Sequence, residues 1–247
     1  IKSPIMVLTA GTDFFDEIID NSLEPGIPNL SALKALCEVL ERRGVSDFPV
    51  HIKLDTGMHR LGFDPVSEID QLIDVLQKQK AVRPCSIFTH LVGADDDLHD
   101  SFSEQQYLLF DCASRKFMNA FKHKIARHIC NSAAIQHFPQ WHMDMCRLGL
   151  GLYGVNPRDN STIHNVSALK TTILQIHDIP AGESVGYSRK TILSRDSRIA
   201  AIPIGYADGL NRQLGNRNAC CIVNGQPAQY VGNICMDVAM IDVTDIS

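Results

Sequence analysis

The segment Val50-His-Ile-Lys-Leu-Asp-Thr-Gly-Met-His-Arg-Leu-Gly-Phe63 decides the fold. It begins as an apolar run typical of a buried strand and ends in a polar loop that carries Lys53, Asp55 and Arg60. A strand that delivers a lysine, a carboxylate and an arginine at its carboxyl end is typical of the anion-binding site of an α/β barrel. A βα unit with solvated surface charges explains this segment equally well on its own.

The composition excludes several classes of protein. The chain has 247 residues, 45% hydrophobic and 21% charged, as expected for a globular protein with a substantial core. The formal charge of −5 argues against a nucleic-acid-binding surface. The sequence contains no run of about 18 apolar residues, so no membrane-spanning helix is predicted. The eight cysteines lack C-x-x-C spacing and no signal peptide is visible, which indicates free thiols in a reducing cytoplasm.

Strand-like and helix-like segments alternate along the first part of the chain, which predicts βαβ units and a parallel sheet. The predicted strands are residues 5–8, 23–27, 50–54, 85–90, 128–131 and 145–150. The predicted helices are residues 14–19, 31–42, 66–79 and 104–121, with Ser31 as the N-cap of the second. Six strands fit either an open doubly wound sheet or a (β/α)₈ barrel of which two units are absent.

The pattern changes after Asn156-Pro157. From there the helical period disappears, and short β-rich runs are separated by glycines. The predicted strands of this part are residues 171–176, 198–204, 220–223, 229–231 and 240–243. We therefore predict an α/β domain over residues 1–157 and a β-rich domain over residues 158–247.

Two later segments are suited to phosphate. Asn131-Ser132 follows a strand and predicts a helix N-terminus, where free N–H groups can bind an anion, although a plain helix cap explains this pair by itself. Gly149, Gly151 and Gly154 form a G-x-G-x-x-G pattern, but the Val-Asn-Pro that follows leaves no room for the helix of a dinucleotide site. Two such segments after consecutive strands favour a phosphorylated cofactor.

The histidines give weaker signals. His90 ends an apolar strand, where it could join a proton network or serve as a structural histidine. The remaining histidines lack the spacing of zinc ligands, so we predict no metal site.

Seven motifs, taken in chain order, resemble those of the pyridoxal-phosphate-dependent alanine racemases. They are Lys53-Leu-Asp-Thr-Gly-Met-His-Arg-Leu-Gly62, Thr89-His90 with Ala94-Asp95, Asn131-Ser-Ala-Ala134, Arg147-x-Gly-x-x-x-Tyr-Gly154, Val185-Gly-Tyr187, Ile202-Pro-Ile-Gly-Tyr-Ala-Asp-Gly209 and Gly232-x-Ile-Cys-Met-Asp237. The sequence is also similar to the racemase part of the ligase–racemase fusions of Bacteroidetes-type bacteria.

The resemblance implies a TIM-type barrel followed by a β-rich domain, in a head-to-tail homodimer that uses pyridoxal 5′-phosphate. The implied activity is the two-base interconversion of L- and D-alanine, which supplies D-alanine for peptidoglycan. About six of the eight barrel units would lie in this chain. The first two, with the lysine that carries the cofactor, would precede Ile1, and a phosphate-contacting tyrosine would follow Ser247.

The resemblance also assigns roles to individual residues. Arg147 would face the pyridine nitrogen of the cofactor. The phosphate would be held by Ser132, Gly149 and Leu150 with Asn131 alongside, and Tyr206 would line the cofactor end of the site.

Substrate contacts and proton transfer follow in the same way. Tyr187 would be one of two proton-transfer residues, tuned by His90, which would hydrogen-bond both Tyr187 and Arg147. Arg60 and the backbone N–H of Met236 would hold the substrate carboxylate. Lys53 matches a lysine that is often carbamylated in this family, and the added carboxylate would orient Arg60. Tyr187 and Met236 would reach the site from the second subunit.

Two alternatives remain at this point. Without the cofactor-carrying lysine, the chain would be a non-catalytic fragment or a binding or assembly module. A different racemase or an amino-acid decarboxylase on the same barrel fits less well, because the Gly205-Tyr-Ala-Asp-Gly209 and Ile234-Cys-Met-Asp237 segments favour the alanine enzymes.

Overall fold

The computed structural model describes residues 2–161, 163–164 and 166–247. These residues form two compact units, Ile1–Ser167 and Ala168–Ser247, each of which is described by itself.

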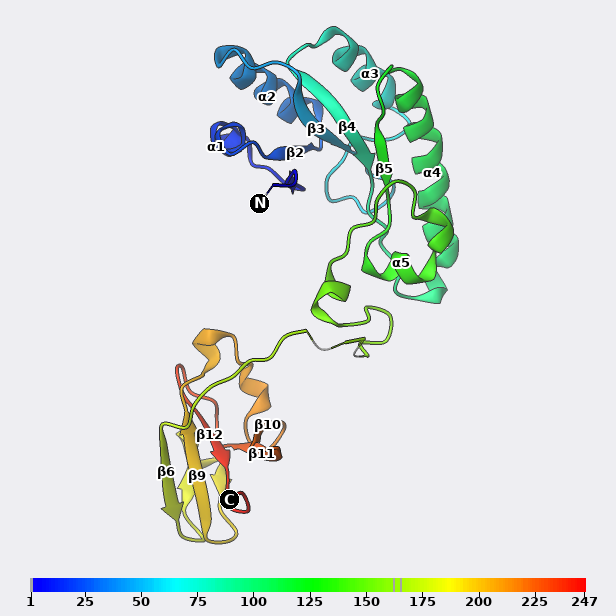
Figure 1. Ribbon diagram of the computed structural model, residues 1–247. Helices are drawn as coiled ribbons and strands as arrows, with labels where there is room; N and C mark the ends of the chain where they lie inside the picture. The colour runs from blue at the N-terminus through cyan, green and yellow to red at the C-terminus, as the bar shows by residue number, and fades with distance from the viewer. Residues whose placement is uncertain (1, 162, 165) are drawn as a thin grey trace. The chain divides into compact units, whose positions relative to one another are not determined.

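Unit 1 is built on a parallel sheet with strand order β1-β2-β3-β4-β5. Its strands are β1 (Met6–Val7), β2 (Glu24–Ile27), β3 (Phe48–Lys53), β4 (Val82–Phe88) and β5 (Ala126–His128). The α-helices that alternate with them are α1 (Phe15–Asp20), α2 (Leu30–Arg42), α3 (Ile69–Lys78), α4 (Asp100–Asn119) and α5 (Ser132–His137). Figure 1 shows α2, α3 and α4 along the outer side of the curved sheet. The prediction of a partial α/β barrel is confirmed.

Helix α2 illustrates how the sequence builds this layer. Its buried face carries Leu33, Leu36 and Leu40, which recur at helical spacing and lie in the same apolar core as Val50 and Ile52 of β3. The helix begins one residue before the predicted start, and Asn29 is its N-cap. The Asn29 side chain accepts a hydrogen bond from the Ala32 N–H at 2.8 Å, so the prediction of Ser31 as the cap is wrong.

The predicted strand at 145–150 does not form, so the described part of unit 1 has five parallel strands and not six. The Arg147 N–H donates to the Cys130 carbonyl at 3.0 Å, which is a single contact and not a ladder. Gly149 then leaves the extended region (φ −110°, ψ −99°), and residues Leu150–Tyr153 close a 3₁₀ turn. The run forms a turn because Gly149 lies within it and Gly151 directly follows its end.

Unit 2 is an antiparallel sheet with strand order β10-β11-β12-β9-β6. Its strands are β6 (Gln175–Ile179), β9 (Ser197–Ile202), β10 (Cys220–Val223), β11 (Gln226–Val231) and β12 (Ala239–Asp242), and a separate two-stranded sheet contains β7 (Ser184–Val185) and β8 (Thr191–Ile192). Alternate residues such as Ala200, Ile202, Tyr230 and Ile241 fill its core. The predicted β-rich second part is confirmed.

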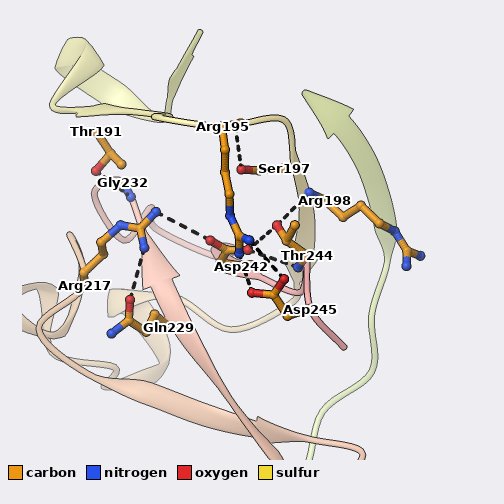
Figure 2. Close-up of polar contacts among 10 residues, drawn as sticks. All are labelled: Thr191, Arg195, Ser197, Arg198, Arg217, Gln229, Gly232, Asp242, Thr244 and Asp245. Atoms are coloured by element: carbon orange, nitrogen blue, oxygen red, sulfur yellow. Dashed lines mark hydrogen bonds and ion pairs between the residues drawn. The ribbon is translucent and has the colours of Figure 1, made fainter. Parts of the chain in front are cut away.

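Polar contacts fix the end of β12 to the start of β9 (Figure 2). The Thr244 hydroxyl accepts a hydrogen bond from the Arg198 N–H at 3.0 Å and donates one to Asp242 at 2.5 Å. Arg195 forms an ion pair with Asp245 on the same edge. These contacts continue the β9–β12 pairing beyond the last strand residue.

No helix among the described residues is both long enough and apolar enough to cross a membrane.

Candidate active site

The carboxyl ends of β3, β4 and β5 meet at one edge of the parallel sheet, as the topology requires. Lys53 is the last residue of β3, and His90 lies two residues after β4 ends. Lys53, His90, Arg60 and Arg147 line one small cavity of about 300 Å³. The structure therefore brings together four residues that the sequence analysis assigned to the site.

The loop between Lys53 and Phe63 is a closed turn. The Asp55 carboxylate accepts hydrogen bonds from the N–H groups of Gly57 (2.9 Å) and His59 (3.0 Å), and the Phe63 N–H donates to the Lys53 carbonyl at 2.8 Å. Gly62 has φ +135°, and a Cβ there would lie 2.5 Å from the Leu54 carbonyl carbon. This return of the chain places Arg60 beside the end of β3.

Three cations, Lys53, Arg60 and Arg147, surround His90. Burial lowers the pKa of Lys53, and the charges of Arg60 and Arg147 lower it further. Burial and then the same kind of repulsion, from Arg147, Arg60 and Lys53 in that order, lower the pKa of His90 to about 4, so its imidazole is neutral at pH 7. Positive charge gathered in this way is complementary to an anionic ligand.

Arg147 has an unusual set of partners. Burial lowers its pKa to about 10. Its Nη1 donates to His128 Nδ1 (2.6 Å) and to the His128 carbonyl (3.2 Å), and its Nη2 donates to the carbonyls of Thr89 (2.7 Å) and Ile129 (3.1 Å). Among the described residues no ion pair includes Arg147 and no hydrogen bond uses its Nε–H. A guanidinium has five N–H donors, so this one remains for a ligand.

We expected His90 to hydrogen-bond Arg147, and the structure differs. Within the described chain the imidazole bonded to Arg147 is that of His128. His128 stacks on Phe88 with ring centroids 4.8 Å apart, and Arg147 lies over the same Phe88 ring at 5.4 Å, so Phe88 holds the pair in register. His90 instead lines the same two cavities as Arg147.

A second cavity of about 410 Å³ adjoins Arg147 and has the predicted phosphate-binding segments on its wall. The Ser132 hydroxyl accepts hydrogen bonds from the N–H groups of Gly149 (2.7 Å) and Gly151 (3.3 Å). The Asn131 side chain caps α5 by accepting from the Ala134 N–H at 3.1 Å. The predicted cofactor residues on this wall are Asn131, Ser132, Arg147, Gly149 and Leu150.

The remaining site residues, Tyr187, Tyr206 and Met236, lie in unit 2. The Tyr206 N–H donates to the Cys235 carbonyl at 3.0 Å, which joins the turn of Tyr206 to the loop of Met236. Gly205 allows this approach, since a Cβ there would lie 2.0 Å from the Met236 carbonyl oxygen. No hydrogen bond of the described residues uses the Met236 N–H, which is the group predicted to hold a carboxylate.

Tyr187 is fixed through its backbone and leaves its side chain accessible. Asn233 donates a hydrogen bond to the Tyr187 carbonyl at 3.0 Å, and Asn216 donates to Asn233 at 2.9 Å. The Tyr187 side chain is 69% exposed and Met236 is 54% exposed. Both residues are therefore available to a second molecule.

The buried polar residues behind Arg147 were not predicted from the sequence. Glu24, His51, Ser86 and His128 form a hydrogen-bonded series inside the sheet. Their signal was a polar residue inside an apolar strand: Ser86 is paired with His51 across β3 and β4. His128 was considered only as a zinc ligand.

One group of possible metal ligands lies elsewhere in unit 1. Asp97, Asp100 and His137 place ligand atoms within 4.8 Å of one another. Arg158 forms an ion pair with Asp97, so a protein cation already faces this group. We assign no metal to it.

Comparisons with known proteins identify the family of both parts of the chain. The model of the alanine racemase N-terminal domain matches residues 1–157, and that of the C-terminal domain matches residues 166–247. An alanine racemase of Clostridium kluyveri is 35% identical over 252 residues, which cover 100% of this chain and 64% of that protein. The chain thus spans less than two thirds of the length of this relative.

Solved structures give the same result. An alanine racemase of Clostridium difficile 630 has a TM-score of 0.88 and 29% identity, with 100% of this chain and 65% of that chain covered. An alanine racemase from Bartonella henselae with covalently bound pyridoxal phosphate has a TM-score of 0.75 and 27% identity, with 99% and 66% covered. Since the two family models together match almost the whole sequence, the chain belongs to the alanine racemase family.

Proposed function

We propose that the protein containing this chain interconverts L- and D-alanine with pyridoxal 5′-phosphate, and that the D-alanine serves peptidoglycan synthesis. The observation that carries the proposal is the meeting of Lys53, Arg60 and Arg147 around a neutral His90 beside a cavity with phosphate-suited donors. The cofactor phosphate and the substrate carboxylate are both anionic groups, and such a site favours them. The two domains that we propose for this activity are the barrel-type domain of residues 1–157 and the β-rich domain of residues 158–247.

The residues present fit the cofactor. The 410 Å³ cavity is within the range of about 300–1,000 Å³ that small-ligand sites occupy. When bound, pyridoxal 5′-phosphate supplies an aldehyde for the amino group of the substrate and an aromatic ring that spreads the electron pair left at the α-carbon. Ser132, Gly149 and Leu150 would bind its phosphate, with Asn131 alongside. Tyr206 would line the end of the site that holds the cofactor.

Arg147 would direct its free Nε–H to the pyridine nitrogen. Its guanidinium stays protonated at neutral pH even with the lowered pKa of about 10. A permanent donor at that nitrogen disfavours its protonation, which limits how far the ring withdraws electrons and so restrains side reactions.

The substrate carboxylate would be held by Arg60 and the Met236 N–H, which has no acceptor among the described residues. Lys53 would orient Arg60 after carbamylation. The lowered pKa of Lys53 supports this, because carbamates form on the neutral amine.

Tyr187 would move the α-proton on one face, with a second base on the opposite face. Tyr187 and Met236 would come from a second copy in a homodimer, and their exposure supports that role. His90 would accept a hydrogen bond from Tyr187 as a neutral imidazole. We also propose a cytoplasmic location, which the eight free thiols support.

The test compares two variants of the full-length protein. Tyr187→Phe removes the proposed proton-transfer hydroxyl, and the control Tyr107→Phe removes the hydroxyl of a tyrosine that is stacked on Trp141. Exchange of the α-proton for solvent deuterium is followed separately from L- and D-alanine. Loss of one general base should slow exchange from one enantiomer by about 10²–10⁴-fold and from the other far less. Equal residual rates from both enantiomers, or equal effects of the two variants, would contradict the proposal.

A further inference from the structure

A buried series of side chains runs from Arg147 through unit 1 to Glu24. The contacts are Arg147 Nη1 to His128 Nδ1 (2.6 Å), His128 Nε2 to Ser86 Oγ (3.0 Å), Ser86 Oγ to His51 Nδ1 (2.6 Å) and His51 Nε2 to Glu24 Oε2 (2.8 Å). The three middle members are almost fully buried: His128 is 0%, Ser86 2% and His51 7% exposed. Strands β2, β3, β4 and β5 each contribute one residue.

The two ends fix the direction of every hydrogen bond in the series. A guanidinium can only donate, so His128 Nδ1 must accept and carries no proton. His128 therefore keeps its proton on Nε2 and donates to Ser86, which leaves the Ser86 hydroxyl proton for His51 Nδ1. His51 then carries its proton on Nε2 and donates to the Glu24 carboxylate, which can only accept. One arrangement of protons satisfies all four contacts.

The charges point the same way. Arg147 has no carboxylate partner among the described residues, and Glu24 is the anion at the far end of the series. The charged or titratable groups that act on His128 are Arg147 and His51, and both disfavour a cationic imidazole, as burial does. His51 faces Glu24, and burial outweighs that attraction, so its pKa is also lowered.

We propose that Glu24, His51 and Ser86 are positioning residues for Arg147. They hold His128 as the neutral Nε2–H tautomer, and this tautomer locks the Arg147 guanidinium in the orientation that leaves Nε–H free for the cavity. The kinetic part of this inference rests on the proposed function, whereas the tautomer and the state of Arg147 do not.

The first measurement is nitrogen NMR on the full-length protein labelled with ¹⁵N at histidine and arginine. His51 and His128 should each show a protonated Nε2 and a bare Nδ1 from pH 6 to pH 8. In Ser86→Ala, the His128 Nε2–H loses its acceptor, so its resonance and that of the Arg147 Nε–H should both shift. The matched control is Ser103→Ala, because Ser103 is equally buried and its hydroxyl has no partner among the described residues; neither signal should change there.

The second measurement separates positioning from simple stability. Ser86→Ala should lower kcat for alanine about 5- to 100-fold, the effect of leaving a buried donor unsatisfied, with the KM changed less than about twofold. Should Ser86→Ala fail to fold, Glu24→Leu and Glu24→Gln replace it. The Gln oxygen can still accept from His51, so Glu24→Gln should keep the tautomers and most of kcat, and Glu24→Leu should lose both.

Several results would overturn the inference: a protonated His128 Nδ1, an Arg147 resonance that stays unchanged in Ser86→Ala, or a kcat equal to that of Ser103→Ala. If the unaltered protein does not racemise alanine, the proposed function fails, and the NMR result alone then decides the positioning role.

Discussion

A methyl group added at Gly205 would force the turn of Tyr206 away from the loop of Met236. The new Cβ would lie 2.0 Å from the Met236 carbonyl oxygen and 2.5 Å from the Asp237 nitrogen, so the backbone on one side must move. Gly205 has extended backbone (φ −140°), which any residue adopts, so the cost of Gly205→Ala is steric. The movement would change the position of Tyr206 relative to Met236.

The magnitude follows from the contacts that the movement breaks. Two hydrogen bonds join the turn and the loop, Tyr206 N–H to the Cys235 carbonyl and Ala207 N–H to the Met236 carbonyl, each 3.0 Å long. Each contributes about 0.5–1.5 kcal/mol, and overpacking costs about 1–3 kcal/mol more. We expect Gly205→Ala to lower the free energy of unfolding of unit 2 by about 2–6 kcal/mol.

The assay is urea unfolding of the full chain, read for unit 2 by hydrogen exchange of peptides that cover residues 203–210 and 230–243. Gly209→Ala is the matched control: Gly209 has φ +94° but no atom within 4 Å of its added Cβ. The free energy of unfolding of that variant should fall only through the left-handed backbone conformation at this position, by about 1–2 kcal/mol. A loss of stability in Gly205→Ala no larger than that in Gly209→Ala, or unchanged exchange at residues 235–238, would refute the steric origin of the effect.

Three further outcomes are expected. Burial and the charge of Arg147 lower the pKa of His128 to about 3, so the unfolded chain binds a proton below pH 6.5 that the folded chain does not. The free energy of unfolding of unit 1 should therefore fall as the pH drops from 6.5 towards 3, by about 1.4 kcal/mol per pH unit for this histidine. A urea midpoint that stays flat from pH 7 to pH 5 would contradict this. Leu36→Ala removes a fully buried side chain of α2 and should cost about 2–5 kcal/mol in urea unfolding, so a loss below 1 kcal/mol would show that the core collapses around the site. Asn29→Ala should cost about 1 kcal/mol and Ser31→Ala a few tenths at most, a difference measurable by thermal unfolding; the reverse order would show that Ser31 caps the helix after all.

The sequence predicted most of unit 1 because its strands and helices have clear periods. The run from Val50 reads as a strand, and β3 is found at Phe48–Lys53. Helix α4 begins at Asp100, four residues before its predicted start at 104, because the polar first turn has no apolar period. The error at 145–150 has a related cause, since the apolar residues of that run lead into a turn that Gly149 and the following Gly151 allow.

The site was predictable only in part. Residues of strand-end loops, such as Lys53, Arg60 and Asn131, stand out because polar residues follow apolar runs, and the structure places them on adjoining cavities. The partner of Arg147 was not predictable, because His128 ends β5, His90 follows β4 by two residues, and spacing does not say which imidazole meets the guanidinium. Contacts across strands depend on register, and register is not visible in one sequence.

The three carbonyls that hold Arg147 belong to the peptide bonds of Thr89, His128 and Ile129. Substituting the side chains of Thr89 or Ile129 leaves these oxygens in the polypeptide, so mutational scans of those two positions would underestimate how firmly the arginine is anchored. To move Arg147 away from these carbonyl oxygens, directed evolution would have to alter the alignment of whole strands or replace the arginine itself. This part of the protein is for that reason expected to resist gradual change, whereas the surrounding loops can vary one residue at a time.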